Sequence, residues 1–272
     1  ERNGASQGDK VVVELKAWES HEDATVGHVV KVLGQEGDND VEMHAILAEY
    51  GLPLEFPPEV EQEAKQFTPS AESKAGLDKK EIAKRRDMRD VLTMTIDPAD
   101  AKDFDDALSL KKLKNGNYEV GIHIADVSYY VKPGSAIDAE AIGRATSVYL
   151  VDRTIPMLPE VLSNDLCSLR PNEDKFAFSA VFEMDEDANV INEWFGRTVI
   201  HSDRRFAYED AQVRLETGEG DLADELALMF KLATKLRERR FENGGIDFNT
   251  EEVRFELDES GKPLRVVIKR MR

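Results

Sequence analysis

Alternating apolar and polar residues near the start of the chain predict two β-strands, over residues 10–18 and 24–33. Both segments are rich in β-branched residues, and a polar stretch separates them. Two strands of this kind are typical of part of a small β-barrel. We therefore expect the first segment of the chain to be all-β.

The pattern then changes to a helical one. Apolar residues at helical spacing predict a helix over residues 39–50. Adjacent prolines at positions 57 and 58 suit the first turn of another short helix. The stretch TPSAESKAG, residues 68–76, has the composition of a linker. We place a domain boundary between Phe67 and Asp90.

Beyond residue 90, strand and helix patterns alternate. Two strand-like segments flank Asn115-Gly116, a dipeptide that tolerates the positive φ of a tight hairpin turn. Helical spacing predicts a helix from Ser135 to Leu150, with Tyr149 near its end. Further patterns predict a hairpin over 176–200, a helix over 221–240 and a final pair of strands over 253–269. This mixture of elements predicts an α+β fold.

Composition narrows the class of protein. The chain has 272 residues, of which 41% are apolar, so it can bury a substantial core. No run approaches the roughly 18 apolar residues of a membrane span, and the N-terminal residues lack the apolar core of a signal peptide. The single cysteine, Cys167, cannot form an intrachain disulfide. These features favour a cytoplasmic location.

The charge is strongly negative. A formal charge of −19 argues against nonspecific binding to nucleic acid, because such binding depends largely on Lys and Arg. Basic residues nevertheless cluster within residues 79–89, 231–240 and 269–272. Each cluster is either a binding surface or an ordinary solvated face balanced by nearby acidic residues, and both interpretations stay open.

The strongest chemical signal is a cluster of carboxylates. The segment TIDPADAKDFDDAL, residues 95–108, places Asp97, Asp103, Asp105 and Asp106 within ten residues, directly before a strand pattern. Two ionised carboxylates about 4 Å apart repel by roughly 4 kcal/mol at an effective dielectric constant of about 20. An ordered cluster must therefore be protonated, solvated or bound to a cation. Hard oxygen ligands favour Mg²⁺ or Mn²⁺, and one or two such ions suit phosphoryl chemistry.

Two familiar aspartate-rich sites do not match the spacing of this cluster. A calcium-binding EF-hand that began at Asp97 would put Ala99, Ala101 and Leu108 at ligand positions, so this alternative fails. A phosphatase with an aspartyl nucleophile would need an apolar strand directly before the aspartate pair, and Ala101-Lys102 stand there instead. A helix cap or a solvated loop needs only one or two of the aspartates and stays open.

Two further residues are weaker candidates. His123 lies in a strand pattern, where a hydrogen-bonded structural role is the simpler interpretation and a ligand role is the alternative. Cys167 has no histidine close to it in sequence and is interpreted as a small, buried apolar residue. The sequence shows no nucleophile elbow, phosphate loop or zinc-ligand spacing.

Several segments recur in the same order as in a known family. They are GDKVVVEL, GHVVKVLG, EYGLPLEFPPEV, GIHIADVSYYV, ATSVYL, TIPMLPEVLSNDLCSLRPNE, RRFAYEDAQ and GGIDFNTEEVRFELDESGKPLRVV. Together with the aspartate cluster they resemble the ribonuclease II and ribonuclease R family, and ribonuclease R more than ribonuclease II. The resemblance covers nearly the whole chain.

The resemblance implies a fold and a domain arrangement. Residues 1–38 would be the C-terminal part of an OB-type cold-shock domain, residues 39–89 a helical linker, and residues 90–272 the N-terminal portion of an RNB exoribonuclease catalytic domain. The fold class is then α+β, with an incomplete OB-type β-barrel followed by the first half of a mixed α/β RNB domain.

The resemblance also implies an activity. Family members are Mg²⁺-dependent, hydrolytic, processive 3′-to-5′ exoribonucleases that degrade single-stranded RNA to nucleoside 5′-monophosphates. The family's metal-binding aspartates correspond to Asp97, Asp103, Asp105 and Asp106, with Mn²⁺ as a substitute for Mg²⁺. Asp105 corresponds to the indispensable catalytic residue, and Tyr149 to the tyrosine that stacks on an RNA base. Single-stranded RNA is the implied partner, without a membrane or a nucleotide cofactor.

The family pattern continues past both ends of this sequence. In the family, helices beyond the position of Arg272 carry further active-site residues, and complete cold-shock barrels need more than the eight residues that precede Asp9. We therefore expect an excised fragment, inactive by itself, that self-associates through uncovered sheet edges. The alternatives are a non-catalytic RNA-binding scaffold and an acidic interaction domain stabilised by cations.

Overall fold

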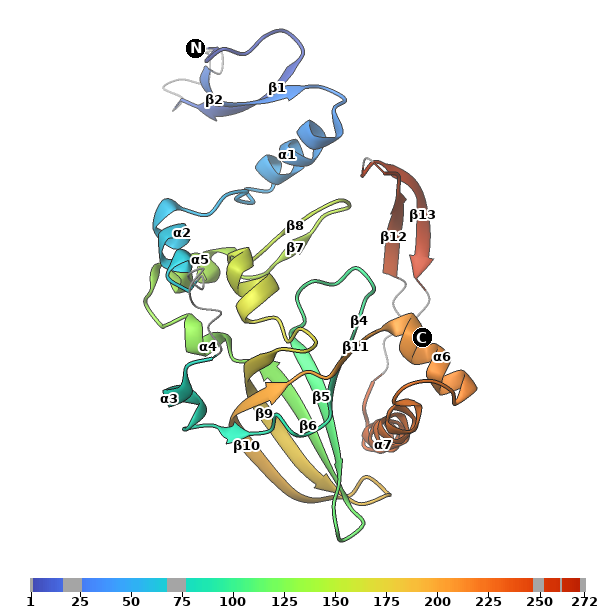
Figure 1. The fold of residues 1–272 in the computed structure, drawn as a ribbon. Helices are drawn as coiled ribbons and strands as arrows, with labels where there is room; N and C mark the ends of the chain where they lie inside the picture. The colour runs from blue at the N-terminus through green and yellow to red at the C-terminus, as the bar shows by residue number, and fades with distance from the viewer. Residues whose placement is uncertain (1, 17–25, 68–76, 247–251, 260, 270–272) are drawn as a thin grey trace. The chain divides into compact units, whose positions relative to one another are not determined.

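The structure is a computed structural model that describes residues 2–16, 26–67, 77–246, 252–259 and 261–269. The chain divides into two compact units, and Figure 1 labels most of their elements. Unit 1 comprises residues 1–57, 140–157 and 250–272, and unit 2 comprises residues 58–139 and 158–249. The predicted linker, residues 17–18 of the first predicted strand and residues 24–25 of the second lie outside the described residues.

Unit 1 is built from short antiparallel sheets and a helix. Strands β1 (Asp9–Leu15) and β2 (Gly27–Gln35) pair with each other, which confirms the two strands predicted from the sequence. Helix α1 (Asn39–Glu49) is capped by the Asp38 side chain, which accepts hydrogen bonds from its first amides. The remaining pairs are β7 (Val148–Tyr149) with β8 (Thr154–Ile155), and β12 (Glu252–Leu257) with β13 (Pro263–Lys269).

Unit 2 is organised around a seven-stranded sheet. Its strands are β3 (Arg86–Asp87), β4 (Thr93–Asp97), β5 (Asp106–Lys112), β6 (Tyr118–Ala125), β9 (Asp174–Met184), β10 (Val190–His201) and β11 (Arg204–Ala207). Their order in the sheet is β11-β4-β5-β6-β9-β10-β3. Strand β11 is parallel to β4 and β3 is parallel to β10, whereas the other neighbours are antiparallel.

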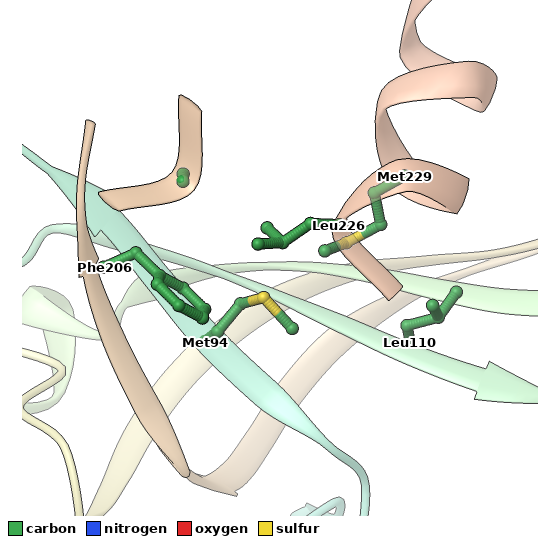
Figure 2. Packing of buried hydrophobic residues seen from close by; sticks show 6 residues of the cluster. Met94, Leu110, Phe206, Leu226 and Met229 are labelled. Carbon is green, nitrogen blue, oxygen red and sulfur yellow. The ribbon is translucent and has the colours of Figure 1, made fainter. Parts of the chain in front are cut away.

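Helices α6 (Tyr208–Thr217) and α7 (Ala223–Glu242) pack on one end of this sheet. Figure 2 shows the side chains of Met94, Leu110, Phe206, Leu226 and Met229 gathered between the strands and α7. Burying each such side chain contributes about 1.5–3 kcal/mol. This core therefore fixes β11, β4 and β5 relative to one another, and the ends of β4 and β5 carry Asp97 and Asp106.

The other helices of the described residues in units 1 and 2 are short. They are α2 (Pro58–Lys65), α3 (Lys79–Ile82), α4 (Val127–Tyr130), α5 (Ala136–Arg144) and the π-helix η1 (Val161–Leu166). Helix α2 begins at Pro58, as predicted from the adjacent prolines, and it buries Val60 and Ala64. The hairpin predicted around Asn115-Gly116 is also confirmed, because β5 and β6 pair and Gly116 has a φ of +93°.

The helix predicted from Ser135 to Leu150 is wrong in its second half. Helix α5 ends at Arg144, and Ala145 has a φ of +63°, which a right-handed helix cannot continue. The Arg144 guanidinium donates to the carbonyl oxygens of Glu55 at 2.8 Å and Pro156 at 3.2 Å. These contacts between distant segments favour ending the helix, so Tyr149 lies in strand β7 instead.

The first basic cluster, within residues 79–89, is largely paired with carboxylates. Arg86 lies 2.8 Å from Glu119, and Arg89 lies 3.1 Å from Asp174. Arg85 has a fully buried side chain that pairs with a buried aspartate. For these arginines the structure supports the simpler interpretation of a balanced structural surface. The mixture of sheets and helices confirms the predicted α+β class.

Candidate functional site

The aspartate cluster lies at one edge of the seven-stranded sheet, by which we mean the side where β4 ends and β5 begins. Asp97 is the last residue of β4, and Asp106 is the first residue of β5. Because β4 and β5 are antiparallel, both residues lie at the same edge of the sheet. Residues 98–105 connect the two strands, and we call residues 97–106 the acidic loop. As predicted, this loop leads directly into the β5–β6 hairpin.

The second half of the acidic loop is held by hydrogen bonds to its backbone. The Ser168 hydroxyl accepts from the backbone N–H of Phe104 at 3.0 Å and donates to the carbonyl oxygen of Lys102 at 2.9 Å. The N–H of Ala125, in β6, donates to the carbonyl oxygen of Asp105 at 3.0 Å. These bonds fix the backbone next to Asp103, Asp105 and Asp106 and leave the carboxylates to other partners.

Asp97 is the buried member of the loop. Only 8% of its surface is exposed, and its Oδ2 is buried without a hydrogen-bond partner. Burial raises the pKa of Asp97, and the negative charges of Asp106 and Asp105 raise it further, against the opposing effects of Thr95 and Arg205. A buried, unpartnered carboxylate oxygen is costly, and a cation would relieve that cost.

Asp105 has a different setting, because its side chain is exposed. Partial loss of hydration nevertheless raises the pKa of Asp105, and the charges of Asp103 and Asp106 add to the effect. Asp97 and Asp105 are therefore each affected by the charges of neighbouring aspartates in the loop. Water can still reach the carboxylate of Asp105.

The fit of this site to a divalent cation can be tested on the geometry. Oxygen-only donors and the unpartnered Asp97 Oδ2 are what Mg²⁺ or Mn²⁺ requires. Among the described residues, however, no group of three or more His, Cys, Asp or Glu side chains is arranged to hold a metal ion. The donor chemistry therefore fits, and the complete ligand set remains a prediction.

His123 has the structural role that the sequence favoured. Its side chain is fully buried, with hydrogen bonds of 2.6 Å between Nδ1 and Ser179 Oγ and 2.9 Å between Nε2 and Ser109 Oγ. Burial, followed by the charge of Arg86, lowers the pKa of His123 to about 4. The imidazole is therefore neutral near pH 7, and both of its nitrogens are occupied.

Cys167 and Tyr149 are the other two candidates from the sequence. Cys167 is buried, as predicted, and burial raises the pKa of its thiol to about 12, so it is not a thiolate nucleophile near pH 7. Tyr149 belongs to unit 1, whereas the acidic loop belongs to unit 2. The side chain of Tyr149 is 68% exposed, opposite Thr154 in the β7–β8 pair.

Two residues at this sheet edge were not singled out from the sequence. The guanidinium of Arg205 donates to the carbonyl oxygens of Pro98 and Ala99, both at 2.8 Å. Asp126 follows the end of β6 and is 3% exposed, with its Oδ2 2.7 Å from Arg85 Nη2. Both residues fall within segments that carried the family resemblance, but only the tertiary structure shows what they contact.

Comparison with known proteins identifies the family. Residues 85–272 match the family model described as RNB domain, and residues 1–57 match the one described as cold shock domain. The chain therefore belongs to the RNB domain family, which confirms the resemblance inferred from the sequence. The matched cold-shock segment includes the β1–β2 pair.

Individual relatives agree with this assignment. The chain is 40% identical to exosome complex exonuclease dis3 of Schizosaccharomyces pombe, over 97% of this chain and 28% of that protein. It is 41% identical to ribonuclease R of Thermotoga maritima, over 97% of this chain and 38% of that protein. It is also similar to the structure of Mycoplasma genitalium RNase R in complex with ribose methylated single-stranded RNA, with a TM-score of 0.88 and 27% identity, covering 100% of this chain and 42% of that one.

The coverage limits what these similarities establish. The chain spans 28% and 38% of the lengths of the two curated relatives, so the activity of such whole proteins is carried to this chain only as a proposal. Within the described residues, no helix is both long enough and apolar enough to cross a membrane.

Proposed function

We propose that this chain is part of a Mg²⁺-dependent, hydrolytic and processive 3′-to-5′ exoribonuclease that degrades single-stranded RNA to nucleoside 5′-monophosphates. The observation that carries the proposal is the acidic loop, in which the buried Asp97 has an unpartnered oxygen beside the charges of Asp105 and Asp106. Membership of the RNB domain family and relatives named as exonucleases support the same reaction.

The aspartates divide into two roles. Asp97, Asp103 and Asp106 would hold a first Mg²⁺, and Asp105 would contribute to a second, with Mn²⁺ as a substitute. Divalent ions held by these aspartates would supply stabilisation of the negative charge that develops on the phosphate and on the departing 3′ oxygen. Asp97 would act as the anchor of the site because it is the carboxylate already withdrawn from water.

Asp105 would orient the attacking water. Its side chain is exposed, so water can approach it. A water held by this carboxylate can attack the last phosphodiester bond in line with the leaving 3′ oxygen.

Tyr149 would bind a base near the 3′ end of the RNA. Its ring is largely exposed on β7. Stacking of a base on an aromatic ring is worth about 1–3 kcal/mol and accepts any base, which suits degradation without sequence preference. This interaction would supply affinity that a chain with a charge of −19 lacks from electrostatics alone.

A nuclease assay tests the proposal. A 5′-labelled single-stranded oligoribonucleotide is incubated in Mg²⁺, in Mn²⁺ and in EDTA with the whole exoribonuclease of which this chain is part and, side by side, with this chain alone. Shortened products are resolved by length, and released nucleotides by chromatography. We expect the whole protein to shorten the RNA stepwise from the 3′ end with release of nucleoside 5′-monophosphates, with none in EDTA, and this chain alone to be inactive. In the whole protein, Asp105→Asn should lower turnover by about 100-fold or more while RNA binding persists.

The control and the contrary results separate the alternatives. Asp187→Asn changes an exposed aspartate in the β9–β10 turn and should leave turnover unchanged. RNA binding without nucleotide release, in either metal, would favour a non-catalytic scaffold. Stabilisation by cations without RNA binding would favour an acidic interaction domain.

Two further inferences accompany this function. A cytoplasmic location agrees with the single, buried cysteine. The two-stranded sheets of unit 1 have edges that can pair with another chain, so we infer self-association at high protein concentration. Sedimentation velocity over a range of concentrations measures it, and a single monomeric species throughout would contradict it.

A further inference from the structure

The acidic loop is anchored differently in its two halves. In the second half, Ser168 and Ala125 bind the backbone of residues 102–105. In the first half, the N–H of Ala101 donates to the carbonyl oxygen of Pro98 at 3.1 Å and closes a turn. That turn directly follows Asp97, so its conformation decides where the chain leaves the sheet.

Arg205 is the residue that holds this turn. It lies in β11 opposite Thr95 of the parallel strand β4. Thr95 precedes Asp97 by two residues. Its Nη2 donates to both Pro98 O and Ala99 O at 2.8 Å. Hydrogen bonds from a charged donor are stronger than neutral ones, and the planar guanidinium fixes the direction of both.

The same guanidinium also reaches the second half of the loop. The Cζ of Arg205 lies 5.3 Å from the centroid of the Phe104 ring, a cation–π distance. Phe104 is 7% exposed, and its backbone N–H is bonded to Ser168. Arg205 thus connects the turn after Asp97 with the segment that carries Asp103 and Asp105.

Arg205 binds the backbone of the loop and leaves its carboxylates accessible to a cation. Within the described residues, its hydrogen bonds go to the two carbonyl oxygens, and no ion pair joins it to a carboxylate. A guanidinium bound directly to Asp97 would compete with a cation for the same oxygens. Its position instead lowers the electrostatic cost of the cluster without occupying a ligand atom.

We propose that Arg205 is a positioning residue that holds the two halves of the acidic loop together and so sets the geometry in which its aspartates bind a divalent cation. The identity of the cation rests on the proposed function. The role of Arg205 in the conformation of the loop does not. Residues that orient metal ligands typically contribute about 10-fold to 100-fold in metal affinity.

The test compares three substitutions on β11. Arg205→Met removes the charge and both hydrogen bonds but keeps an unbranched side chain, and Arg205→Lys keeps the charge without the planar fork. Arg204→Met is the matched control, because Arg204 is the neighbouring arginine on the same strand, with a 2.7 Å ion pair to Asp221 and a cation–π contact to Phe206. Asp97→Asn reports whether the acidic loop binds the ion at all.

Two measurements are made on the full chain. Electron paramagnetic resonance of free Mn²⁺ gives the affinity, and we expect Arg205→Met to weaken it about 10-fold or more, Arg205→Lys less, and Arg204→Met hardly at all. Amide hydrogen exchange over residues 98–105, without metal, should be at least about 10-fold faster in Arg205→Met than in Arg204→Met. Thermal unfolding of both methionine variants checks that each is folded.

The outcomes distinguish this inference from the proposed function. Equal exchange rates in Arg205→Met and Arg204→Met overturn the positioning role, whatever the metal does. If Asp97→Asn no longer binds Mn²⁺ but Arg205→Met and Arg204→Met bind it with equal affinity, the positioning role of Arg205 is also overturned. If Asp97→Asn binds Mn²⁺ as tightly as the parent, the metal assignment fails instead, and the exchange rates still decide the role of Arg205.

Discussion

Protonation of His123 should destabilise the sheet that carries the acidic loop. His123 lies in β6 opposite Ala107 of β5, the residue that follows Asp106. Its imidazole is fully buried and bonded through both nitrogens to the hydroxyls of Ser109 and Ser179. A positive charge on the ring would have to be buried there without a carboxylate among these partners.

The magnitude follows from the pKa. Burial, and then the charge of Arg86, lowers the pKa of His123 from 6.5 to about 4. Between these two values the unfolded chain binds a proton that the folded chain does not, so stability falls as the pH is lowered. The slope approaches about 1.36 kcal/mol per pH unit, and the loss between pH 7 and pH 5 is about 2 kcal/mol.

The carboxylates of the acidic loop act in the opposite direction. Burial raises the pKa of Asp97, and desolvation raises the pKa of Asp105, above the ordinary value of 3.8. Their folded forms therefore retain protons that the unfolded chain has lost, and stability falls as the pH rises above that value. A comparison between the parent and a variant of His123 cancels this contribution.

The assay is urea unfolding of the parent and of His123→Gln at pH 7 and at pH 5. His123→Gln loses stability at both values, because an amide cannot replace both imidazole hydrogen bonds. The decrease on going from pH 7 to pH 5 should be smaller in the variant by about 2 kcal/mol. His201→Gln removes another imidazole from the same sheet and serves as the control, and NMR titration follows His123 directly. The same decrease in parent and variant, or titration of His123 near 6.5, would refute the reasoning.

Three other predictions concern single side chains. Asp97→Asn should raise stability in EDTA by about 1 kcal/mol, because it removes a buried charge, and should abolish stabilisation by Mg²⁺. Thermal unfolding measures both effects, and an unchanged response to Mg²⁺ would contradict the assignment of Asp97 as a metal ligand. Gly121→Ala should cost about 1–3 kcal/mol in urea unfolding, because its Cβ would lie 2.3 Å from Ser109 Oγ; wild-type stability would show that the hydroxyl moves aside. Ser168→Ala should cost about 1–3 kcal/mol and accelerate hydrogen exchange at Phe104, whose N–H loses its partner; unchanged protection would mean that another acceptor replaces the hydroxyl.

Local features of the fold could be predicted from the sequence. Asn115-Gly116 predicted the β5–β6 hairpin because the turn needs a residue with positive φ, and Gly116 has one. The density of aspartates predicted that neighbouring carboxylates would influence one another, and the raised pKa values of Asp97 and Asp105, to which the charge of Asp106 contributes, show it. In both cases the residues that interact lie within a few positions of one another.

Features that depend on distant contacts could not be predicted in this way. The helix through Ser135 ends at Arg144, where Ala145 has a positive φ and the Arg144 side chain donates to the carbonyl oxygen of Glu55, 89 positions away in sequence. Arg205 binds Pro98 across 107 positions, and Ser168 binds Lys102 across 66. Neither residue belongs to a motif whose spacing specifies a partner, so only the sheet order reveals that they hold the acidic loop.

The two buried aspartates at this sheet edge, Asp126 and Asp97, have pKa values shifted in opposite directions. This contrast gives a last prediction. Asp126 pairs with Arg85 at 2.7 Å, and although burial favours a higher value, the Ser128 hydroxyl and Arg85 hold the pKa of Asp126 below its ordinary range. Asp97 has a raised pKa, and no ion pair to it occurs among the described residues.

Removing each charge should therefore have opposite effects. Asp126→Asn removes one of the two carboxylates paired with the fully buried Arg85, whose other partner is Glu81 at 2.9 Å, and should cost about 1–3 kcal/mol in urea unfolding, whereas Asp97→Asn should stabilise the protein in EDTA. A sheet edge that needed its carboxylates only for structure would lose stability in both variants. Stabilisation by Asp97→Asn alone would show that this aspartate is retained at a cost to folding, as expected of a residue kept for binding a cation.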